Sequence, residues 1–597
     1  MGVLKERAEV EKAIAGTTVA DALLETATRH PDAPAFTQGD ETLTWSEARE
    51  RVLRIAAAFT VLGLEPGDTV VLMMPNRTEH VLADLGVVHA GGIPTTLYAT
   101  LAPEQIAYVA GDCGARYAVL DGPSQVERWA PVLSRLPGLR AVIVLTDCPP
   151  GDPYLSWESF LRLGEPGGAA RWRDLTPDST LTVLYTSGTT GRPKGVIVTH
   201  RMALYECRVS DDTSELPEGS VGVSYLPFAH IADRVLSIYL PVVRGTHVYF
   251  CADPSRLAAT LARARPHGFF GVPRVWEKMM AAIQAVLAAE QDDARRAAVT
   301  AAMDAGRAYV ESREYGRETS PAVLEAFQRA DETVLAPMRA LIGLDRVRQT
   351  LSAAAPLPLD VARFFAGLGL CILDVYGMTE TTGAATANRP DSFKLGTVGR
   401  AMPGIELRIA DDGEILIRGT TCTPGYLNLA SAELLDADGW VHTGDLGELD
   451  DDGFLKVVDR KKEIIITAGG ENIAPSLIEN LLKEHPLVGQ ALAYGDGRRY
   501  VVAVLTLDGE VAPAWAAARG IEGGLADLAS HPLVLEEIAR AVEEANGRLA
   551  RVQQVKRWHL LPDEWTTESE ELTPTLKLKR RVIHSKYADT FTAMYET

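Results

Sequence analysis

Helix and strand patterns alternate through the first 120 residues, and this alternation limits the fold more than any other feature of the chain. Apolar residues recur at helical spacing over residues 46–62, and the apolar run over residues 68–74 is typical of a strand buried on both faces. The same succession of helix and strand patterns is repeated over residues 79–97 and 103–120. Alternating units of this kind predict a layered α/β architecture with a largely parallel sheet.

The pattern changes twice further along the chain. Residues 276–341 are rich in Ala, Arg and Glu with almost no strand signal, which predicts a helical insertion. Two Asp-rich stretches ending in glycine, at residues 411–413 and 450–453, separate β-rich runs and predict hairpin turns. From Ile473 onward the pattern is that of a compact α+β unit.

These changes of pattern predict the domain organisation. We expect a large N-terminal domain over residues 1–458, made of layered α/β subdomains plus a β-barrel-like part. A hinge is predicted at residues 459–462, followed by a small, mobile α+β domain over residues 463–597. The fold class is therefore α/β.

Charge and cysteine usage exclude several classes of protein. The chain has 59 Lys and Arg against 80 Asp and Glu, a net charge of -21, which argues against non-specific nucleic-acid binding or docking on an anionic membrane. Its six cysteines are scattered without a CxxC pair, which disfavours structural zinc and disulfides. The N-terminus lacks a signal-peptide pattern, and no apolar run approaches the roughly 18 residues that span a bilayer. We therefore expect a cytoplasmic protein.

The segment YTSGTTGRPKGVIVTH, from Tyr185 to His200, has the chemistry of a polyphosphate cradle. It follows an apolar strand, its three glycines let the backbone approach an anion closely, and Thr and Ser side chains add hydroxyl donors beside Lys194. It is not a Walker A loop, because Pro193 disfavours helix at Arg192 and a strand-like run follows the lysine.

This segment resembles the phosphate loop of the adenylate-forming superfamily, which includes acyl-CoA synthetases, luciferases and peptide-synthetase adenylation domains. Further motifs resemble that family in the same order along the chain. They are PFAH at Pro227–His230, VYGMTE at Val375–Glu380, WVHTGD at Trp440–Asp445, DRKKEI at Asp459–Ile464 and GGENI at Gly469–Ile473. The resemblance extends over about residues 20–585.

The resemblance implies that the chain binds ATP, Mg²⁺ and CoA. Nucleotide contacts are implied at Thr186, Ser187, Gly188, Thr189, Thr190, Gly191, Lys194, Ala354, Asp374, Tyr376, Gly377, Thr379, Asp445, Arg460 and Lys577. Thr186 and Glu380 are the implied Mg²⁺ ligands, and hard oxygen donors suit that ion. Asp445 and Arg460 are expected at the ribose. His230 is a catalytic candidate that shapes the acyl or thiol approach, with a satisfied core histidine as the alternative.

An essential lysine is expected near the C-terminus. The stretch from Leu572 to Arg581 resembles the family's lysine motif with Leu576 in place of the usual glycine, and its register selects Lys577. Lys579 is the alternative, on the same face of an expected strand. The family rotates its C-terminal domain between two half-reactions, which implies a pivot at Lys462 and a CoA-side turn at Gly469 and Gly470.

Several segments resemble the long-chain fatty acyl-CoA synthetase branch, including VPRVWEK around Trp276 and the helical insertion. We therefore expect a fatty acid:CoA ligase, with Trp276 lining the acyl pocket or packing in the core, and at most transient membrane contact for substrate pick-up. Three alternatives stay open: a fatty acyl-AMP ligase that loads a carrier protein, a ligase for an aryl or other acid, and a catalytically silent paralogue.

Overall fold

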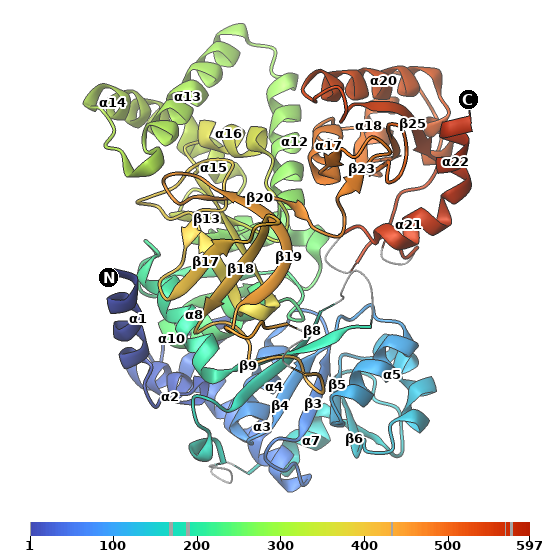
Figure 1. Cartoon of the computed structure of the whole chain (residues 1–597). Helices are drawn as coiled ribbons and strands as arrows, with labels where there is room; N and C mark the ends of the chain where they lie inside the picture. Colours follow the sequence, from blue (N-terminus) through green and yellow to red (C-terminus); the bar gives the residue numbers. More distant parts are fainter. Residues whose placement is uncertain are drawn as a thin grey trace. The chain divides into compact units, whose positions relative to one another are not determined.

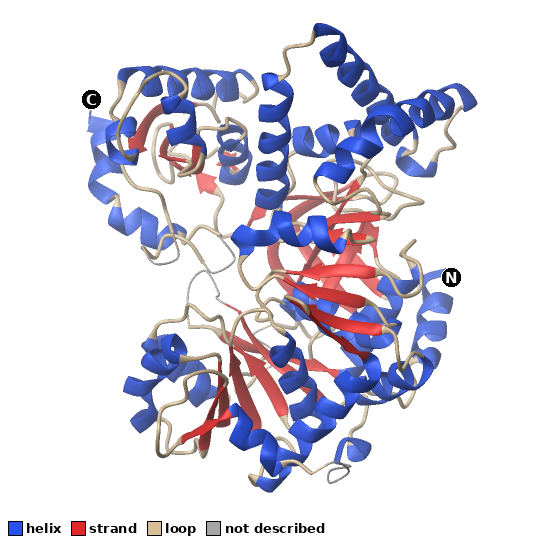
Figure 2. Ribbon diagram, turned by 180° about the vertical axis from the view of Figure 1, so that it is seen from behind, coloured by secondary structure: helices blue, strands red, loops and turns tan. Residues whose placement is uncertain are grey.

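The computed structural model describes residues 2–165, 171–186, 192–430, 434–566, 569–573 and 577–596, with side chains from residue 7 onward. The chain forms two compact units. The first comprises residues 1–408, 416–442 and 451–455, and the second comprises residues 409–415, 443–450 and 456–597. Figures 1 and 2 show the elements that make up each unit.

A parallel five-stranded sheet confirms the expected α/β layers of the first unit. Its strand order is β4-β3-β5-β6-β7, and every neighbouring pair is parallel. The strands are β3 (Thr69–Met73), β4 (Ile93–Thr96), β5 (Ala115–Leu120), β6 (Ala141–Val144) and β7 (Tyr154–Ser156). All five residues of β3 are buried, as the apolar run predicts for a strand covered on both faces. Helices flank this sheet in Figure 2.

Local signals fix the ends of the helices around this sheet. They are α2 (Val19–Arg29), α3 (Trp45–Val61), α4 (Thr78–His89), α5 (Pro103–Asp112), α6 (Pro123–Trp129) and α7 (Trp157–Leu163). Thr18 and Asp21 form a capping box at the start of α2, and Thr44 and Glu47 form another at the start of α3. These helices begin and end within about three residues of the predicted bounds where a prediction was made.

Two further sheets and a hairpin complete the core of the first unit. A four-stranded sheet has the order β10-β11-β1-β2, and a five-stranded sheet has the order β12-β13-β14-β15-β16. Their strands are β1 (Pro34–Gln38), β2 (Glu41–Thr44), β10 (Val221–Ser224), β11 (His247–Phe250), β12 (Gly268–Phe270), β13 (Gln349–Ser352), β14 (Ile372–Met378), β15 (Gly383–Ala387) and β16 (Arg400–Ala401). The hairpin of β8 (Thr180–Thr186) and β9 (Lys194–Thr199) is followed by α8 (His200–Asp212).

The predicted insertion is helical, as expected. It contains α12 (Pro273–Ala289), α13 (Asp293–Ser312), α14 (Pro321–Ala330) and α15 (Ala336–Leu341). Figure 1 shows α13 and α14 side by side, and a parallel ring stack joins Tyr309 to Phe327 with centroids 4.0 Å apart. Many side chains here face solvent, for example Val286 at 68% exposure. None of the described helices is long and apolar enough to cross a membrane.

Both predicted hairpin turns lie in a sheet of order β17-β18-β19-β20. Its strands are β17 (Ile405–Ile409), β18 (Glu414–Gly419), β19 (Val441–Leu449) and β20 (Leu455–Arg460). Gly413 and Gly453 adopt φ of 84° and 80° in the two turns, the left-handed region that favours glycine. The two Asp-rich stretches therefore form turns at the positions expected from sequence.

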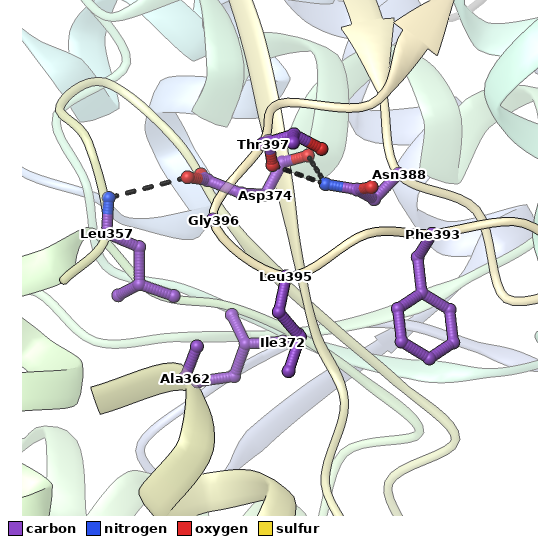
Figure 3. Close-up of a pocket in the computed structure, with 9 residues that line it drawn as sticks. All are labelled: Leu357, Ala362, Ile372, Asp374, Asn388, Phe393, Leu395, Gly396 and Thr397. Carbon is purple, nitrogen blue, oxygen red and sulfur yellow. Dashed lines mark hydrogen bonds between the residues drawn. The ribbon is translucent and has the colours of Figure 1, made fainter. Parts of the chain in front are cut away.

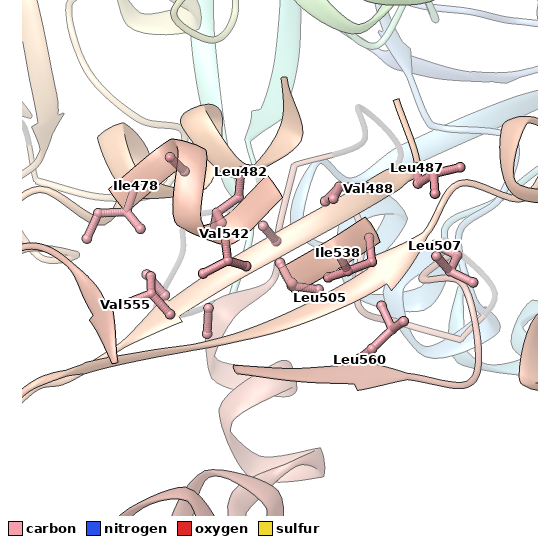
Figure 4. Close-up of a cluster of buried hydrophobic side chains, with 14 of the residues drawn as sticks. Ile478, Leu482, Leu487, Val488, Leu505, Leu507, Ile538, Val542, Val555 and Leu560 are labelled. Carbon is pink, nitrogen blue, oxygen red and sulfur yellow. The ribbon is translucent and has the colours of Figure 1, made fainter. Parts of the chain in front are cut away.

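The second unit has its own core around a three-stranded sheet of order β23-β24-β25. The strands are β23 (Val488–Tyr494), β24 (Val501–Leu507) and β25 (Val555–Leu561), and the helices are α17 (Pro475–Lys483), α18 (Val511–Ala517), α19 (Leu525–Ala529), α20 (Pro532–Gly547), α21 (Arg580–Lys586) and α22 (Ala588–Glu596). Figure 4 shows Ile478 and Leu482 of α17 and Ile538 of α20 packed against Leu505 of β24. This continuous apolar core gives the α+β unit its compactness.

Candidate active site

The β8–β9 hairpin presents the two described ends of the predicted phosphate loop. Thr186 at the end of β8 pairs with Lys194 at the start of β9. The strand that follows the lysine agrees with the argument against a Walker A loop. The other predicted contacts of this loop lie outside the described residues; they are Ser187, Gly188, Thr189, Thr190 and Gly191.

Tyr426 connects Lys194 with the predicted metal carboxylate. The Lys194 ammonium lies 4.7 Å from the centroid of the Tyr426 ring, a cation–π contact. The hydroxyl of the same tyrosine donates a 2.9 Å hydrogen bond to Oε1 of Glu380. Glu380 is only 5% exposed. One side chain thus holds a cation and a carboxylate that are 186 positions apart in sequence beside each other.

The turn that carries Glu380 depends on glycine and threonine. A Cβ atom at Gly377 would lie 1.7 Å from the carbonyl oxygen of Gly383, so only glycine fits where β14 meets β15. The Thr381 hydroxyl accepts a hydrogen bond from the Met378 amide and donates one to the Gly383 carbonyl. Thr382, at φ of 60°, donates its hydroxyl proton to the carbonyl of Thr421. Thr379 is the first residue of this turn.

The donor set here suits one Mg²⁺ ion carried by a polyphosphate. Mg²⁺ binds through one or two protein oxygens and keeps waters and phosphate oxygens as its other ligands. Glu380 provides a carboxylate held in place by Tyr426, and Thr186 provides a hydroxyl. No group of three or more His, Cys, Asp or Glu side chains that could hold a metal occurs among the residues described.

The predicted adenine side of the site contains the half-buried carboxyl group of Asp374. Asp374 on β14 accepts hydrogen bonds from the amides of Leu357, at 3.4 Å, and Val375, at 3.2 Å. Burial raises the pKa of Asp374 to about 8, so the group is largely protonated at neutral pH. A small pocket lies beside it, between Leu357 and Asn388 (Figure 3). Tyr376 follows on the same strand, half-buried.

Ala354 departs from ordinary backbone geometry. Its φ of 77° places a residue with a Cβ atom in the left-handed region, which costs about 1 kcal/mol or more. Strained backbone of this kind is concentrated at ligand sites. Ala354 directly precedes Ala355 and Pro356, in the loop that leads to the pocket beside Asp374.

His230 begins a short helix, α9 (Ile231–Arg234), and its ring caps it. The Nδ1 atom accepts a 3.2 Å hydrogen bond from the amide of Ala232. Because Nδ1 is an acceptor, the neutral ring carries its proton on Nε2. His230 therefore uses Nδ1 to cap α9, and its catalytic role stays a prediction.

Asp233 and Arg234, the last two residues of α9, anchor this helix to other elements of the first unit. Oδ2 of Asp233 accepts hydrogen bonds from Asn76 and Ser224, both at 2.7 Å. Arg234 pairs with Asp84 in α4 and donates to Thr96 at the end of β4. The side chains of Arg234 and Asp84 are completely buried. The His230 turn is therefore fixed to two strands, to helix α4 and to the loop before that helix.

Trp276 lies in the apolar core of the first unit. Its side chain is 0% exposed and contacts Phe269 and Phe365 edge-on, with ring centroids 5.2 Å and 4.9 Å away. Its indole nitrogen donates to the carbonyl of Leu351 at 3.3 Å. This packing supports the core alternative for Trp276, and its role at an acyl pocket stays a prediction.

The predicted ribose pair is formed within the second unit. Nε of Arg460 on β20 lies 2.7 Å from Oδ1 of Asp445 on β19. Asp445 is 5% exposed, and its amide donates to the Thr443 hydroxyl at 3.1 Å. An ion pair between neighbouring strands thus holds this carboxylate in place.

Lys577 belongs to the same unit and is not part of any strand among the described residues. Leu572 and Leu578 form a single antiparallel bridge, and α21 begins at Arg580, so the expected strand through Lys579 is wrong. The side chain of Lys577 is exposed. Repulsion from the Arg460 guanidinium lowers the pKa of Lys577, while attraction from Asp445 and Glu463 raises it. Lys577 therefore lies in the field of the ribose pair.

The remaining predicted residues of the second unit lie at exposed turns. Lys462 is exposed directly after Arg460 and Lys461. Gly469 and Gly470 are exposed at the turn between β21 (Ile465–Ile466) and β22 (Asn472–Ile473), where Gly470 has φ of 81°. Glycines allow a close backbone approach at such a turn. Their roles at a pivot and on the CoA side stay predictions.

Sequence reasoning missed Tyr426, Asp233 and Arg234. Tyr426 lies outside the motifs considered, in the loop after β18, and only its proximity to Lys194 and Glu380 shows its importance. The charged pair at 233–234 follows the PFAH motif after two apolar residues. Two adjacent charges next to apolar residues, in a turn expected to be buried, are the signal that could have found them.

Comparisons with known proteins agree with this geometry. The model of the family described as AMP-binding enzyme matches residues 23–427, and the model of the AMP-binding enzyme C-terminal domain matches residues 462–597. Two solved structures share the fold. The adenylation domain of a carboxylate reductase from Mycobacterium chelonae has a TM-score of 0.79 at 22% identity, covering 100% of this chain and 95% of that one. An anthranilate CoA ligase in complex with anthranoyl-AMP has a TM-score of 0.74 at 19% identity, covering 97% and 98%.

Relatives at higher identity span most of the chain. A protein of Mycobacterium tuberculosis named putative fatty-acid–CoA ligase fadD11 is 40% identical over 79% of this chain and 80% of its own length. Long-chain-fatty-acid–CoA ligase FadD15 of the same species is 33% identical over 93% and 92%. Long-chain-fatty-acid–CoA ligase ACSBG2 of Xenopus laevis is 33% identical over 97% and 84%.

Proposed function

Because this chain belongs to the AMP-binding enzyme family of adenylate-forming enzymes, we propose that it is an ATP-dependent ligase that joins a long-chain fatty acid to CoA. The observation that carries the acyl class is the 33% identity to a long-chain-fatty-acid–CoA ligase over 93% of the chain. The Tyr426–Glu380 hydrogen bond in the first unit and the Arg460–Asp445 ion pair in the second unit support this chemistry.

In the first half-reaction a carboxylate oxygen of the fatty acid attacks the α-phosphorus of ATP. The bond from that phosphorus to the bridging oxygen of pyrophosphate breaks, which gives acyl-AMP and pyrophosphate. Negative charge grows on the phosphoryl oxygens, so positioned donors and cations lower the barrier. Lys194 is one such cation, held on the Tyr426 ring. Glu380 and Thr186 would hold Mg²⁺, which neutralises phosphate charge when bound.

Lys577 is the second cation that we assign to this half-reaction. Its ammonium lies in the field of Asp445 and Arg460, the pair that we place at the ribose. Contact with the carboxylate or α-phosphate from that position would stabilise the charge of the transition state. His230, with its proton on Nε2, would donate to an oxygen of the fatty acid carboxylate.

In the second half-reaction the sulfur of CoA attacks the acyl carbonyl carbon of acyl-AMP. The bond from that carbon to the phosphate oxygen breaks, AMP leaves and the thiol proton passes to solvent. We propose a hinge at residues 459–462 between domains 1–458 and 463–597, with Lys462 as its pivot and the Gly469–Gly470 turn approaching the thiol. The exposure of this turn supports that role.

We also propose a cytoplasmic location with transient membrane contact, since the substrate class partitions into lipid. The net charge of -21 supports contact that is brief, because an anionic surface repels it.

Pyrophosphate release tests the proposal. Purified protein, ATP and Mg²⁺ are incubated with acids of several classes, with and without CoA. We expect AMP-forming turnover with long-chain fatty acids that needs CoA to proceed beyond one equivalent. Turnover with an acyl carrier protein in place of CoA would show a carrier-loading ligase. Preference for aryl acids would contradict the acyl class, and no exchange of pyrophosphate with any acid would contradict catalysis itself.

A further inference from the structure

Arg580 makes three charged hydrogen bonds within the second unit. Its Nη1 and Nη2 atoms donate to Oε1 and Oε2 of Glu479 on α17, both at 2.6 Å, and its Nε donates to Oε2 of Glu463 at 2.9 Å. The bidentate geometry to Glu479 is the strong form of an Arg–carboxylate pair. All three side chains are at most 18% exposed. The guanidinium is therefore held without freedom to reorient.

These bonds join two segments that matter for the proposed reaction. Arg580 is the first residue of α21, three positions after Lys577. Glu463 is the residue directly after the proposed hinge at 459–462. Glu479 is fixed in turn, because its Oε1 atom also accepts the amide of Ala493 on β23 at 2.8 Å. Arg580 thus connects the lysine segment, the end of the hinge and the central sheet of the unit.

The other end of the hinge is fastened to the same helix. Asp459 accepts a 2.9 Å hydrogen bond from the amide of Ser476, in the first turn of α17. The two residues that flank the segment 460–462 are therefore both tied to α17, Asp459 directly and Glu463 through Arg580 and Glu479. A rotation about this segment would leave the Arg580 contacts unchanged, since all of them lie on its C-terminal side.

We propose that Arg580 is a positioning residue that holds Lys577 in register with the hinge through its ion pair to Glu463. This role rests on the proposed function, in which Lys577 serves adenylation and leaves the site when the hinge rotates. Arg580 touches no substrate in this scheme. It fixes where the lysine segment begins relative to Arg460, and so it fixes where the ammonium is placed.

Electrostatics provide a second connection between the same residues. The charged groups that act on the Lys577 ammonium are Arg460, Asp445 and Glu463. Glu463 raises the pKa of Lys577, so the carboxylate that receives Arg580 also stabilises the charged lysine. Removing that carboxylate must lower the pKa of Lys577 further and shift the alkaline limit of adenylation to lower pH.

The decisive variant is Glu463→Gln, since it keeps the shape of the side chain and leaves the Arg580–Glu479 pair intact. Adenylation is measured by pyrophosphate release across pH 6–10, and thioester formation is measured from preformed acyl-AMP and CoA. We expect adenylation to fall about tenfold and its alkaline limb to move down by about half a pH unit, with thioester formation unchanged. Arg580→Gln should lose more adenylation, because it also leaves the buried Glu479 without its cation.

Matched controls come from neighbouring exposed residues. Arg581→Gln changes the next arginine, and Glu543→Gln changes an exposed carboxylate of α20. Both should leave the rates and the pH profile unchanged. Equal loss of both half-reactions in Glu463→Gln would mean a merely structural brace and would overturn the proposal. The proposal would also be overturned if the adenylation rate of Glu463→Gln and its alkaline limit both equalled those of the wild type.

A measurement without substrate separates this inference from the proposed function. The reaction of Lys577 with an amine-specific acylating reagent is followed against pH by mass spectrometry of its peptide. Only the uncharged amine reacts, so the midpoint reports the pKa of Lys577. We expect a lower midpoint in Glu463→Gln than in the wild type, even if the enzyme proves inactive on every acid. An identical midpoint would overturn the coupling whatever the activity.

Discussion

The hydroxyl of Tyr426 donates a 2.9 Å hydrogen bond to Glu380, while the ring of the same residue carries the ammonium of Lys194 at 4.7 Å. The tyrosine therefore fixes both the carboxylate that we assign to Mg²⁺ and the cation that we assign to phosphate. Groups that orient a metal ligand in this way typically change metal affinity by about 10–100-fold when removed.

Tyr426→Phe should raise the Mg²⁺ concentration needed for half-maximal pyrophosphate release by about tenfold or more. The ring stays in place under Lys194, so the Michaelis constant for the fatty acid should be unaffected. Tyr117→Phe is the control, because it removes a comparable hydroxyl that donates to the carbonyl of Leu62. An Mg²⁺ requirement equal to that of the wild type would show that Tyr426 does not orient the metal carboxylate.

Lys577→Ala should reduce adenylation by about 10²–10³-fold, because a cation at the reacting phosphate is lost. Thioester formation from preformed acyl-AMP should be preserved, since we place Lys577 outside the site in that state. Both half-reactions are measured on the same preparation. Lys579→Ala, two residues away, should retain adenylation, and the reverse outcome for the two lysines would assign the role to Lys579.

Asp84→Asn should lower the free energy of unfolding by about 3–5 kcal/mol, because it leaves the fully buried guanidinium of Arg234 without a counter-charge. Urea unfolding of both proteins measures the difference. The exposed pair of Arg329 and Glu325 provides the control, since side chains at 69% and 68% exposure contribute little. Equal effects of Asp84→Asn and Glu325→Gln would contradict the inferred cost of the buried charge.

Glu206 predicts a dependence of stability on pH. This buried carboxyl in α8 accepts the amide of Ala384 at 2.9 Å, and burial raises its pKa to about 8 from an ordinary value of 4.5. Between about pH 4.5 and pH 8 the unfolded chain loses a proton that the folded protein keeps, so stability falls as pH rises through this window. The stabilising contribution is complete below pH 4.5 and is lost above pH 8.

Glu206→Gln should remove this dependence. The unfolding free energy of the variant minus that of the wild type should increase by about 2–4 kcal/mol between pH 5 and pH 8. The buried Asp374 and Asp233 remain in both proteins, so their own shifts cancel in the difference. A difference that does not vary with pH would mean that Glu206 titrates near its ordinary value in the folded protein.

Local elements were predictable because their signals are local. The helix predicted over 46–62 forms α3 over Trp45–Val61, and the apolar run over 68–74 forms β3, an inner strand of a parallel sheet. Capping boxes, apolar spacing and turn glycines each involve residues only a few positions apart, so they can be recognised in the sequence. The strand expected through Lys579 does not form, because the four closely spaced basic residues of this stretch carry no local signal that distinguishes a strand from the start of a helix.

Chemistry was predictable at the level of residue types. A run of glycines, hydroxyls and a lysine can bind polyphosphate in few other ways, and the resemblance of five ordered motifs fixed the family. The sequence alone therefore determined the fold class, the reaction type and most candidate residues.

Pairings between distant segments were decided only in the tertiary structure. Tyr426 with Glu380, Arg234 with Asp84 and Arg580 with Glu463 are joined across 46, 150 and 117 positions. Such contacts depend on how the sheets bring strand ends together, and a one-dimensional pattern holds no record of that arrangement.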